Sequence, residues 1–336
     1  MIRFSWLQFR TQAAVAFGVL AVVAVVLAVT GPHLVNLYDT TVATCSVHHD
    51  CSATTTALVN TDGPLQVFTS LLLLLVPVLI GIFWGAPLVA REYETGTFRL
   101  AWTQGVTRTR WLAVKLGLGA LVSMAFAGLL SLMVTWWSSP IDRLRTDPYN
   151  FLVFGARDIT PLGYAAFAFV LGVTAGVLIR RTLPALATTM VGFVVARLGV
   201  IYWVRPHLIA PFHKDLAINS APTLNIGLTQ TGVQVVATTR GLDISNAWIY
   251  SSEIVDKAGY APTTAFLDHA CPFGKVSHAP NFQTCTANIA AKFHEVVTYQ
   301  PGSHYWTLQW YETAIFLGVA VVLAGLSFLW IRRPPA

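Results

Sequence analysis

The chain has 336 residues, of which 55% are hydrophobic and only 11% are charged, and its mean hydropathy is +0.61. This composition excludes an ordinary soluble globular protein and is typical of a multi-pass membrane protein. The formal net charge of +6 comes from basic residues that lie beside apolar segments. We therefore read it as a sign of membrane topology and predict no binding of nucleic acid.

The N-terminal residues 1–12 have the pattern of an amphipathic helix. Trp6 and Phe9 share one helical face, and Arg3 and Arg10 lie beside it. We predict an interfacial helix that leads into the first membrane span. It serves either as a simple anchor or as a collar that moves with a partner protein.

Six apolar segments are each close to the length of about 20 residues that crosses about 30 Å of hydrocarbon as a helix. The sequence thus predicts an all-α polytopic protein, with helices 1–5 in residues 13–204 and helix 6 in residues 311–336. The predicted spans are Ala13–Thr30, Val67–Ala90, Trp111–Trp137, Pro161–Ile179, Leu183–Val204 and Thr313–Ile331.

The distribution of charge between the connecting segments predicts the orientation. With both termini inside, the inner segments hold eleven Arg or Lys residues and two Glu residues, whereas the outer segments hold nine basic and thirteen acidic residues. Lys and Arg accumulate on the cytoplasmic side of membrane proteins, which supports this orientation.

Residues 205–310 then form an extracellular insertion between helices 5 and 6, and the segment is long enough for a small folded domain. Val233–Thr239 alternates like a strand, and Thr286–Val297 is compatible with a helix. We predict a mixed α/β domain.

All four cysteines fall on the predicted outer side, where thiols oxidise. Two disulfides are expected. We favour the local pairs Cys45 with Cys51 and Cys271 with Cys285, while pairing between the two outer segments stays open. The alternative for the first pair is a metal site, which we disfavour and do not predict; its ligands would be the two thiolates, His48, His49 and Asp50.

The sequence lacks the usual signatures of an enzyme. Gly274-Lys275 has no upstream glycine at the spacing of a phosphate-binding loop, and neither HExxH nor Gly-x-Ser-x-Gly occurs. We predict that the chain is not itself an enzyme and holds no cofactor. Any work from ATP hydrolysis has to come from another chain.

One charge lies within a predicted span. Arg197 precedes Arg205 by seven residues, which places it roughly 10 Å below the outer surface at 1.5 Å per residue. We expect it to snorkel outward or to pair with Glu312. The alternative is a substrate path in which Arg197 and Glu312 contact an anionic group.

Two pairs of glycines have the spacing that lets helices approach closely. They are Gly81 with Gly85, and Gly172 with Gly176. This spacing permits either close contact between helices of one chain or dimerisation.

The inner segment 91–110 carries the most specific pattern. Arg91, Glu92 and Glu94 end an apolar span, Gly96 allows a turn, and an apolar and tryptophan-containing return follows. A short helix of this kind at the membrane surface suits a groove on a soluble partner.

This pattern resembles the permease subunits of type-2 ATP-binding-cassette exporters, in their actinobacterial form. The matching residues are Arg91-Glu92-Tyr93-Glu94-Thr95-Gly96-Thr97, followed by Leu100, Trp102, Arg108, Arg110, Trp111 and Lys115. The segment from Tyr299 to Arg333 is also similar, although His304 stands where family members often have arginine.

The resemblance implies a permease in the plasma membrane of a bacterium, with two separate ATPase subunits that bind ATP and Mg²⁺. It also implies a second permease copy, as a homodimer or alternatively a heterodimer. Its substrate is expected to be hydrophobic or amphipathic and to move outward by alternating access. The residues expected to couple to the ATPase are Glu92, Glu94, Gly96, Thr97, Phe98, Leu100, Trp102, Arg180 and Arg181. A membrane sensor or scaffold that signals to an ATPase without transport is the alternative function.

Overall fold

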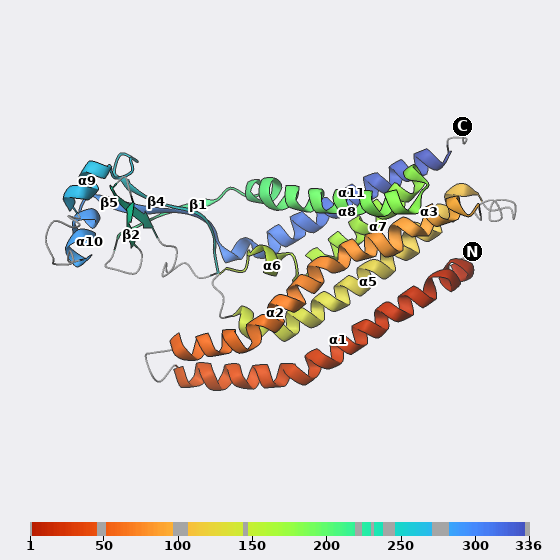
Figure 1. Cartoon of the computed structure of the whole chain (residues 1–336), viewed down its shortest axis with the longest axis horizontal. Coiled ribbons are helices and arrows are strands. Elements are labelled where there is room, and N and C mark those ends of the chain that lie inside the picture. The colour runs from red at the N-terminus through yellow and green to blue at the C-terminus, as the bar shows by residue number, and fades with distance from the viewer. Residues whose placement is uncertain are drawn as a thin grey trace. The chain divides into compact units, whose positions relative to one another are not determined.

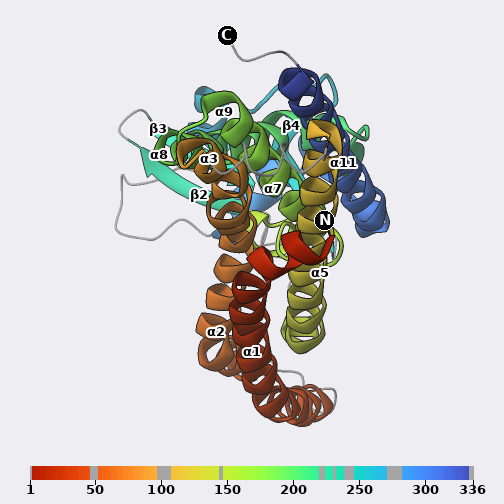
Figure 2. The same ribbon diagram turned by 90° about the vertical axis from the view of Figure 1, so that its right-hand side faces the viewer.

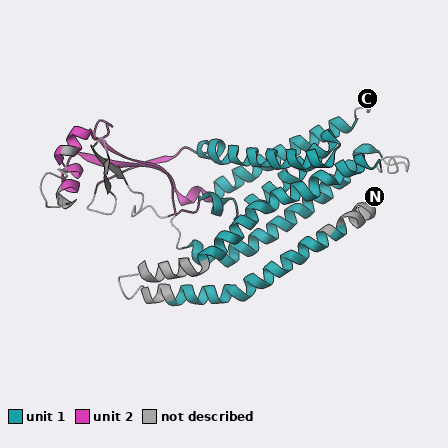
Figure 3. Cartoon of the chain, in the orientation of Figure 1, with its two compact units in different colours: residues 1–145, 150–209, 306–336 teal, residues 146–149, 210–305 magenta. Residues whose placement is uncertain are grey.

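The computed structural model describes residues 2–45, 52–96, 107–143, 147–218, 224–229, 232–237, 246–270 and 282–332 (Figure 1). The chain divides into two compact units (Figure 3). The first, here called the helical unit, comprises residues 1–145, 150–209 and 306–336. The second, the sheet unit, comprises residues 146–149 and 210–305.

Within the residues that the structure describes, six helical segments are long and apolar enough to cross a membrane, which confirms the predicted multi-pass fold. Most of them extend well beyond the segments predicted from hydropathy. From Ile2 onward, the N-terminal segment forms one continuous helix with the first span, as a helix leading into that span would, and its interfacial position stays a prediction. The observed segments are Ala13–Thr40, Gly63–Thr95, Arg108–Asp142, Thr160–Ile179, Thr182–His207 and Gly302–Arg332.

Several of these segments combine more than one helical element. The second consists of α2, the π-helix η1 and α3; the fifth consists of α8, the π-helix η2 and the 3-10 turn η3. A short helix, α6, precedes the fourth. The bounds are α1 Ile2–Cys45, α2 Ser52–Ile80, η1 Gly81–Gly85, α3 Ala86–Glu94, α5 Arg108–Asp142, α6 Phe151–Phe154, α7 Thr160–Ile179, α8 Thr182–Gly199, η2 Val200–Val204, η3 Arg205–His207 and α11 Tyr305–Arg332.

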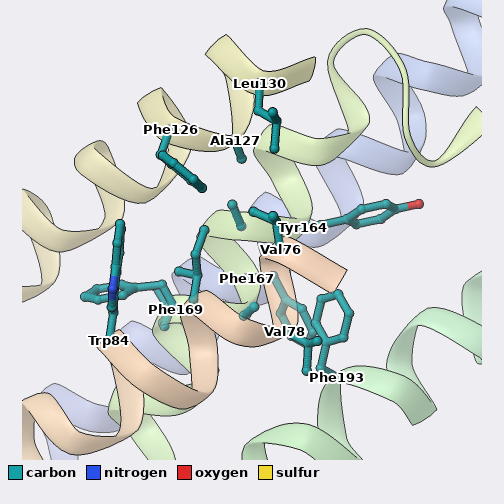
Figure 4. Close-up of a cluster of buried hydrophobic side chains, with 14 of the residues drawn as sticks. Val76, Val78, Trp84, Phe126, Ala127, Leu130, Tyr164, Phe167, Phe169 and Phe193 are labelled. Carbon is teal, nitrogen blue, oxygen red and sulfur yellow. The ribbon is translucent and has the colours of Figure 1, made fainter. Parts of the chain in front are cut away.

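Helix α7 is the centre of the helical unit, and most of its residues are buried. It packs against α2, α3, α5 and α8, as the end-on view shows (Figure 2). Aromatic rings fill the space around it (Figure 4). The Phe167 ring lies 5.2 Å from that of Phe316 and 6.1 Å from that of Phe193 between centroids.

The two glycine pairs pack against each other within the chain. A Cβ atom on Gly172 would lie 2.3 Å from the carbonyl oxygen of Gly81, and one on Gly176 would lie 2.8 Å from that of Ala86. Only glycine allows such a close backbone approach. The structure therefore confirms the predicted close contact between helices and places it between α7 and the segment η1–α3.

The sheet unit contains a three-stranded antiparallel sheet between the fifth and sixth membrane helices, as predicted. The strand order is β1-β5-β4, and Phe212 pairs with Tyr299 while Trp248 pairs with Gln300. A separate hairpin joins β2 and β3, and β3 confirms the strand expected near Val233. The bounds are β1 Phe212–Leu216, β2 Leu224–Thr229, β3 Gly232–Ala237, β4 Trp248–Asp256, α9 Thr264–Ala270, α10 Phe282–Ala290, β5 Phe293–Gln300 and η4 Gly302–His304.

The helix predicted over Thr286–Val297 is wrong in its second half. Helix α10 ends at Ala290, and β5 begins at Phe293. Glu295 and Val297 are buried on alternate positions of this strand, and β5 is the central strand of the sheet, paired on both edges. Pairing with distant strands overrides the local preference for helix.

Cys285 is disulfide-bonded, but the predicted pairing of the cysteines is not tested by this structure. Cys285 lies in α10 and is 3% exposed, whereas Cys51 and Cys271 lie outside the described residues. His48, His49 and Asp50, the other ligands of the disfavoured metal site, also lie outside them.

Candidate functional site

The first acidic residue of the predicted coupling segment is bound within the chain. Glu92 of α3 forms an ion pair with Lys115 of α5, whose side chain is only 2% exposed. The Lys115 Nζ atom also donates to the carbonyl oxygen of Leu88 at 3.4 Å and lies 4.6 Å from the centroid of the Trp111 ring. A buried ammonium group needs such partners. Glu92 thus ties the end of the second span to the start of the third.

The second acidic residue joins the two predicted inner contacts. One carboxylate oxygen of Glu94 accepts a hydrogen bond from the backbone nitrogen of Thr182 at 2.8 Å, and the other accepts from the Thr182 hydroxyl at 2.6 Å. Because Thr182 is the first residue of α8, Glu94 satisfies an otherwise unpaired helix N-terminus. The structure brings together α3 and the Arg180-Arg181 turn, which the sequence presented as separate sites.

The Arg180-Arg181 turn begins with a residue in a left-handed backbone conformation. Arg180 has a φ of 57°, in the left-handed region, and closes α7 through a hydrogen bond from its nitrogen to the oxygen of Gly176 at 3.0 Å. Its guanidinium carbon lies 5.5 Å from the centroid of the Tyr93 ring. The side chains of Arg180 and Arg181 are both exposed.

Helix α3 ends at a glycine, as expected. Gly96 has a φ of 71°, a conformation in which glycine commonly terminates helices. Thr97, Phe98, Leu100 and Trp102 lie outside the described residues, so their coupling role stays a prediction.

A second group, of charged and polar residues, is buried in the helical unit. We call Tyr164, Arg197, Arg205 and Glu312 the buried polar cluster. Arg205 donates through Nε and Nη2 to the two carboxylate oxygens of Glu312 at 2.8 and 2.9 Å. The exposed fractions of the two side chains are 2% and 0%. This forked geometry is the strongest form of arginine–carboxylate pair.

Neighbouring polar groups complete the environment of Glu312. The Tyr164 hydroxyl of α7 donates to its carboxylate. One turn earlier on α11, Gln309 accepts from the Thr160 backbone nitrogen at 3.1 Å and donates to the carbonyl oxygen of Phe154 at 3.0 Å. These contacts join the fourth, fifth and sixth spans.

Arg197 neither snorkels to the surface nor pairs directly with Glu312, so both structural expectations for it were wrong. The residue is 9% exposed. Its Nη1 donates to the carbonyl oxygen of Leu74 at 3.3 Å, and its guanidinium carbon lies 4.7 Å from the centroid of the Tyr164 ring. A Cβ atom at Gly155 would come within 2.6 Å of its Nη2. The carboxylate expected to pair with Arg197 is held by Arg205 instead.

Sequence reasoning missed Arg205 and Gln309. Arg205 marked the end of the fifth span, and Glu312 stood near the start of the sixth. Because the predicted topology places these two positions at the same membrane surface, an ion pair between Arg205 and Glu312 could have been predicted from the sequence. Gln309 gave no comparable signal, since a neutral side chain near an interface needs no partner.

The chain matches the family described as ABC-2 membrane transporter related over residues 17–205. The match covers more than half of the chain, including nearly all of the first five spans, Glu92, Glu94 and the Arg180-Arg181 turn. No curated protein and no solved structure matches the chain.

Proposed function

This chain belongs to the ABC-2-related family of membrane transporters, and from this we propose that it is the permease subunit of an ATP-binding-cassette exporter in a bacterial plasma membrane. It moves a hydrophobic or amphipathic substrate outward. Two separate ATPase subunits bind ATP and Mg²⁺ and hydrolyse the ATP. A second permease copy, identical or related, completes the membrane pathway. Family membership and six candidate membrane helices support this proposal.

The coupling surface is the end of α3 with the segment that follows it. The observation that carries this assignment is the double hydrogen bond from Thr182 to Glu94. Together with the Glu92–Lys115 pair, it attaches the segment to the third and fifth spans. A displacement of the segment by an ATPase therefore acts on three spans at once.

The glycine contact transmits this displacement to the centre of the helical unit. Because η1 and α3 pack against α7 backbone to backbone at Gly172 and Gly176, the second span has no flexible side chains there to absorb movement. Alternating access then proceeds through the displacement of whole helices rather than of single residues.

We assign Arg197 and Glu312 a structural role. Their polar groups are engaged by Leu74, Tyr164 and Arg205 of the same chain. A substrate path through the buried polar cluster would have to displace these contacts, and breaking a buried ion pair costs about 3–5 kcal/mol.

The proposal is tested by reconstituting the chain with its ATPase in vesicles and measuring ATP hydrolysis and outward transport together. Leu100→Asp and Trp102→Asp should detach or uncouple the ATPase, because apolar anchors dominate such contacts. Arg332→Gln, at the exposed end of α11, is the matched control. Full affinity and full coupling in both aspartate variants would refute the assignment. Stimulated hydrolysis without any transport would favour the sensor function instead.

A further inference from the structure

A groove with an entirely apolar lining runs between α1, α2 and α5. Its volume is about 490 Å³, within the roughly 300–1,000 Å³ that is usual for small-molecule pockets. Val23 of α1, Leu75 and Ile80 of α2, and Phe126 and Leu130 of α5 contribute to its walls. The groove exists because α1 contacts the bundle along a narrow stripe, in which every seventh residue is buried: Ala13, Leu20, Leu27 and Leu34.

A second cavity adjoins this groove. Its volume is about 480 Å³, and Thr11 and Val15 line it. It shares Ala16, Phe83 and Trp84 with the groove. From Val23 to Thr11 the joined cavities follow α1 for roughly 18 Å at 1.5 Å per residue. On α1 this length is close to the depth of one leaflet, which is half of about 30 Å of hydrocarbon. On the second span the lining runs from Phe68 to Trp84, or roughly 24 Å, so the joined cavities reach at least the depth of one leaflet.

Two arginines stand at the Thr11 end of the joined cavities. Arg10 is the neighbour of Thr11, and Arg91 follows Trp84 by seven residues, or roughly 10 Å of helix. The start of α1 and the end of α3 lie at the same end of the helical unit (Figure 1). Both arginine side chains are exposed, and within the described residues neither forms an ion pair.

The nearby acidic groups have other partners. Glu92 is paired with Lys115, and Glu94 accepts two hydrogen bonds from Thr182 and lies near Arg181. The joined cavities therefore combine an open apolar groove, at least one leaflet long, with two exposed arginines at one end. This is the complement of an amphiphile with one long chain and an anionic head.

We propose that the joined cavities bind one acyl chain of an anionic phospholipid of the surrounding membrane, with its phosphate at Arg10 and Arg91. The lipid fills the space between α1 and α2 and holds α1 in place. A second copy of the chain fits less well, because a two-fold contact through this surface would set the arginines of one copy against those of the other. This inference does not depend on the proposed transport function.

Trp84 allows the site to be observed directly, because it lines both cavities. The full chain is placed in phosphatidylcholine vesicles that contain either brominated phosphatidylglycerol or brominated phosphatidylcholine. Bromine quenches tryptophan fluorescence on contact, and the Trp84 signal is the difference between the unaltered chain and Trp84→Phe. We expect phosphatidylglycerol to quench this signal at a markedly lower mole fraction than phosphatidylcholine.

Point variants test separately how the site binds the head group and the acyl chain of the lipid. Arg10→Gln and Arg91→Gln should each reduce the preference for phosphatidylglycerol roughly five-fold, since a basic residue near a membrane surface contributes about 1 kcal/mol. Arg332→Gln should leave the preference unchanged. Ala16→Phe fills the junction of the two cavities and should abolish the quenching of Trp84 by both lipids. Ala14→Phe, on the exposed face of α1, should not.

Equal quenching by the two lipids in the unaltered chain overturns the proposal, because it indicates ordinary contact with bulk lipid. Undiminished quenching in a folded Ala16→Phe protein also overturns it. If neither lipid quenches Trp84 and an Ala16→Cys variant forms cross-linked dimers, the groove belongs to a second copy instead. The arginine variants keep the test valid even where Ala16→Phe fails to fold.

Discussion

The charged contacts at the two ends of the helical unit differ in how far water reaches them. In the buried polar cluster, the Arg205 and Glu312 side chains are 2% and 0% exposed. At the other end, Lys115 is 2% exposed but its partner Glu92 is 17% exposed, and Glu94 is exposed. Buried ion pairs are costly to break, whereas exposed ones contribute little. The comparison indicates that the last three spans are held rigidly together. The contacts of α3 with α5 and α8, where the ATPase is proposed to act, can rearrange more easily.

Removing the carboxylate of the buried cluster should have the largest effect on stability. Glu312→Leu leaves the Arg205 guanidinium buried without its partner, so the free energy of unfolding should fall by about 3–5 kcal/mol. Thermal unfolding of the solubilised chain measures this. Glu253→Leu, at an exposed position of β4, is the matched control and should change little.

A double variant sharpens this result. Arg205→Met combined with Glu312→Leu removes both charges, and apolar replacement of a whole buried pair is often close to neutral. The double variant should therefore be more stable than Glu312→Leu alone. If the double variant is less stable than Glu312→Leu, the unpaired Arg205 guanidinium is not the cause of the stability lost in Glu312→Leu.

Breaking the ion pair at the opposite end should have a smaller effect. Glu92→Leu leaves the Lys115 ammonium group with the Leu88 carbonyl and the Trp111 ring. We expect a loss of about 1.5–3 kcal/mol in the free energy of unfolding, the usual contribution of a hydrogen bond to a charged group. Asp39→Leu, on an exposed part of α1, serves as the control. A loss as large as that of Glu312→Leu would contradict the distinction between the two ends.

Arg197→Lys tests the remaining member of the buried polar cluster. Lysine loses the planar contact with Tyr164 and reaches the Leu74 carbonyl less well. The free energy of unfolding should fall by about 1–2 kcal/mol, while the order of preference among exported substrates stays the same. Unchanged stability with selective loss of export would place the substrate beside Arg197 and refute the structural role.

The smallest effect on stability is expected at Glu94. Because this side chain is exposed, Glu94→Gln should leave the unfolding temperature unchanged. It should nevertheless raise the number of ATP molecules hydrolysed per substrate exported, since the link between α3 and α8 is weakened. Thr182→Val, which removes the hydroxyl that donates to Glu94, should do the same. Normal coupling in both variants would show that the contact between Glu94 and Thr182 does not transmit movement between α3 and α8.

The sequence predicted the parts of this fold that depend on hydropathy and local chain geometry. The six spans follow from apolar length, and the close packing at Gly81 and Gly172 follows from the absence of side chains. The sequence could not assign Glu312 to Arg205 instead of Arg197, because that choice depends on how α8 and α11 are placed relative to each other. The strand β5 was missed for the same reason, since its partners β1 and β4 are distant in the chain.

In the proposed function, the segment after α3 contacts a separate ATPase. A photo-reactive amino acid at Trp102, introduced into the full chain in native membranes, tests it most directly. We expect a cross-link to a protein that carries a phosphate-binding loop of the form G-x-x-x-x-G-K-[ST], and no such cross-link from Leu326 on the exposed face of α11. Cross-links from Trp102 only to lipid or to proteins without this loop, in a folded chain, would contradict the claim.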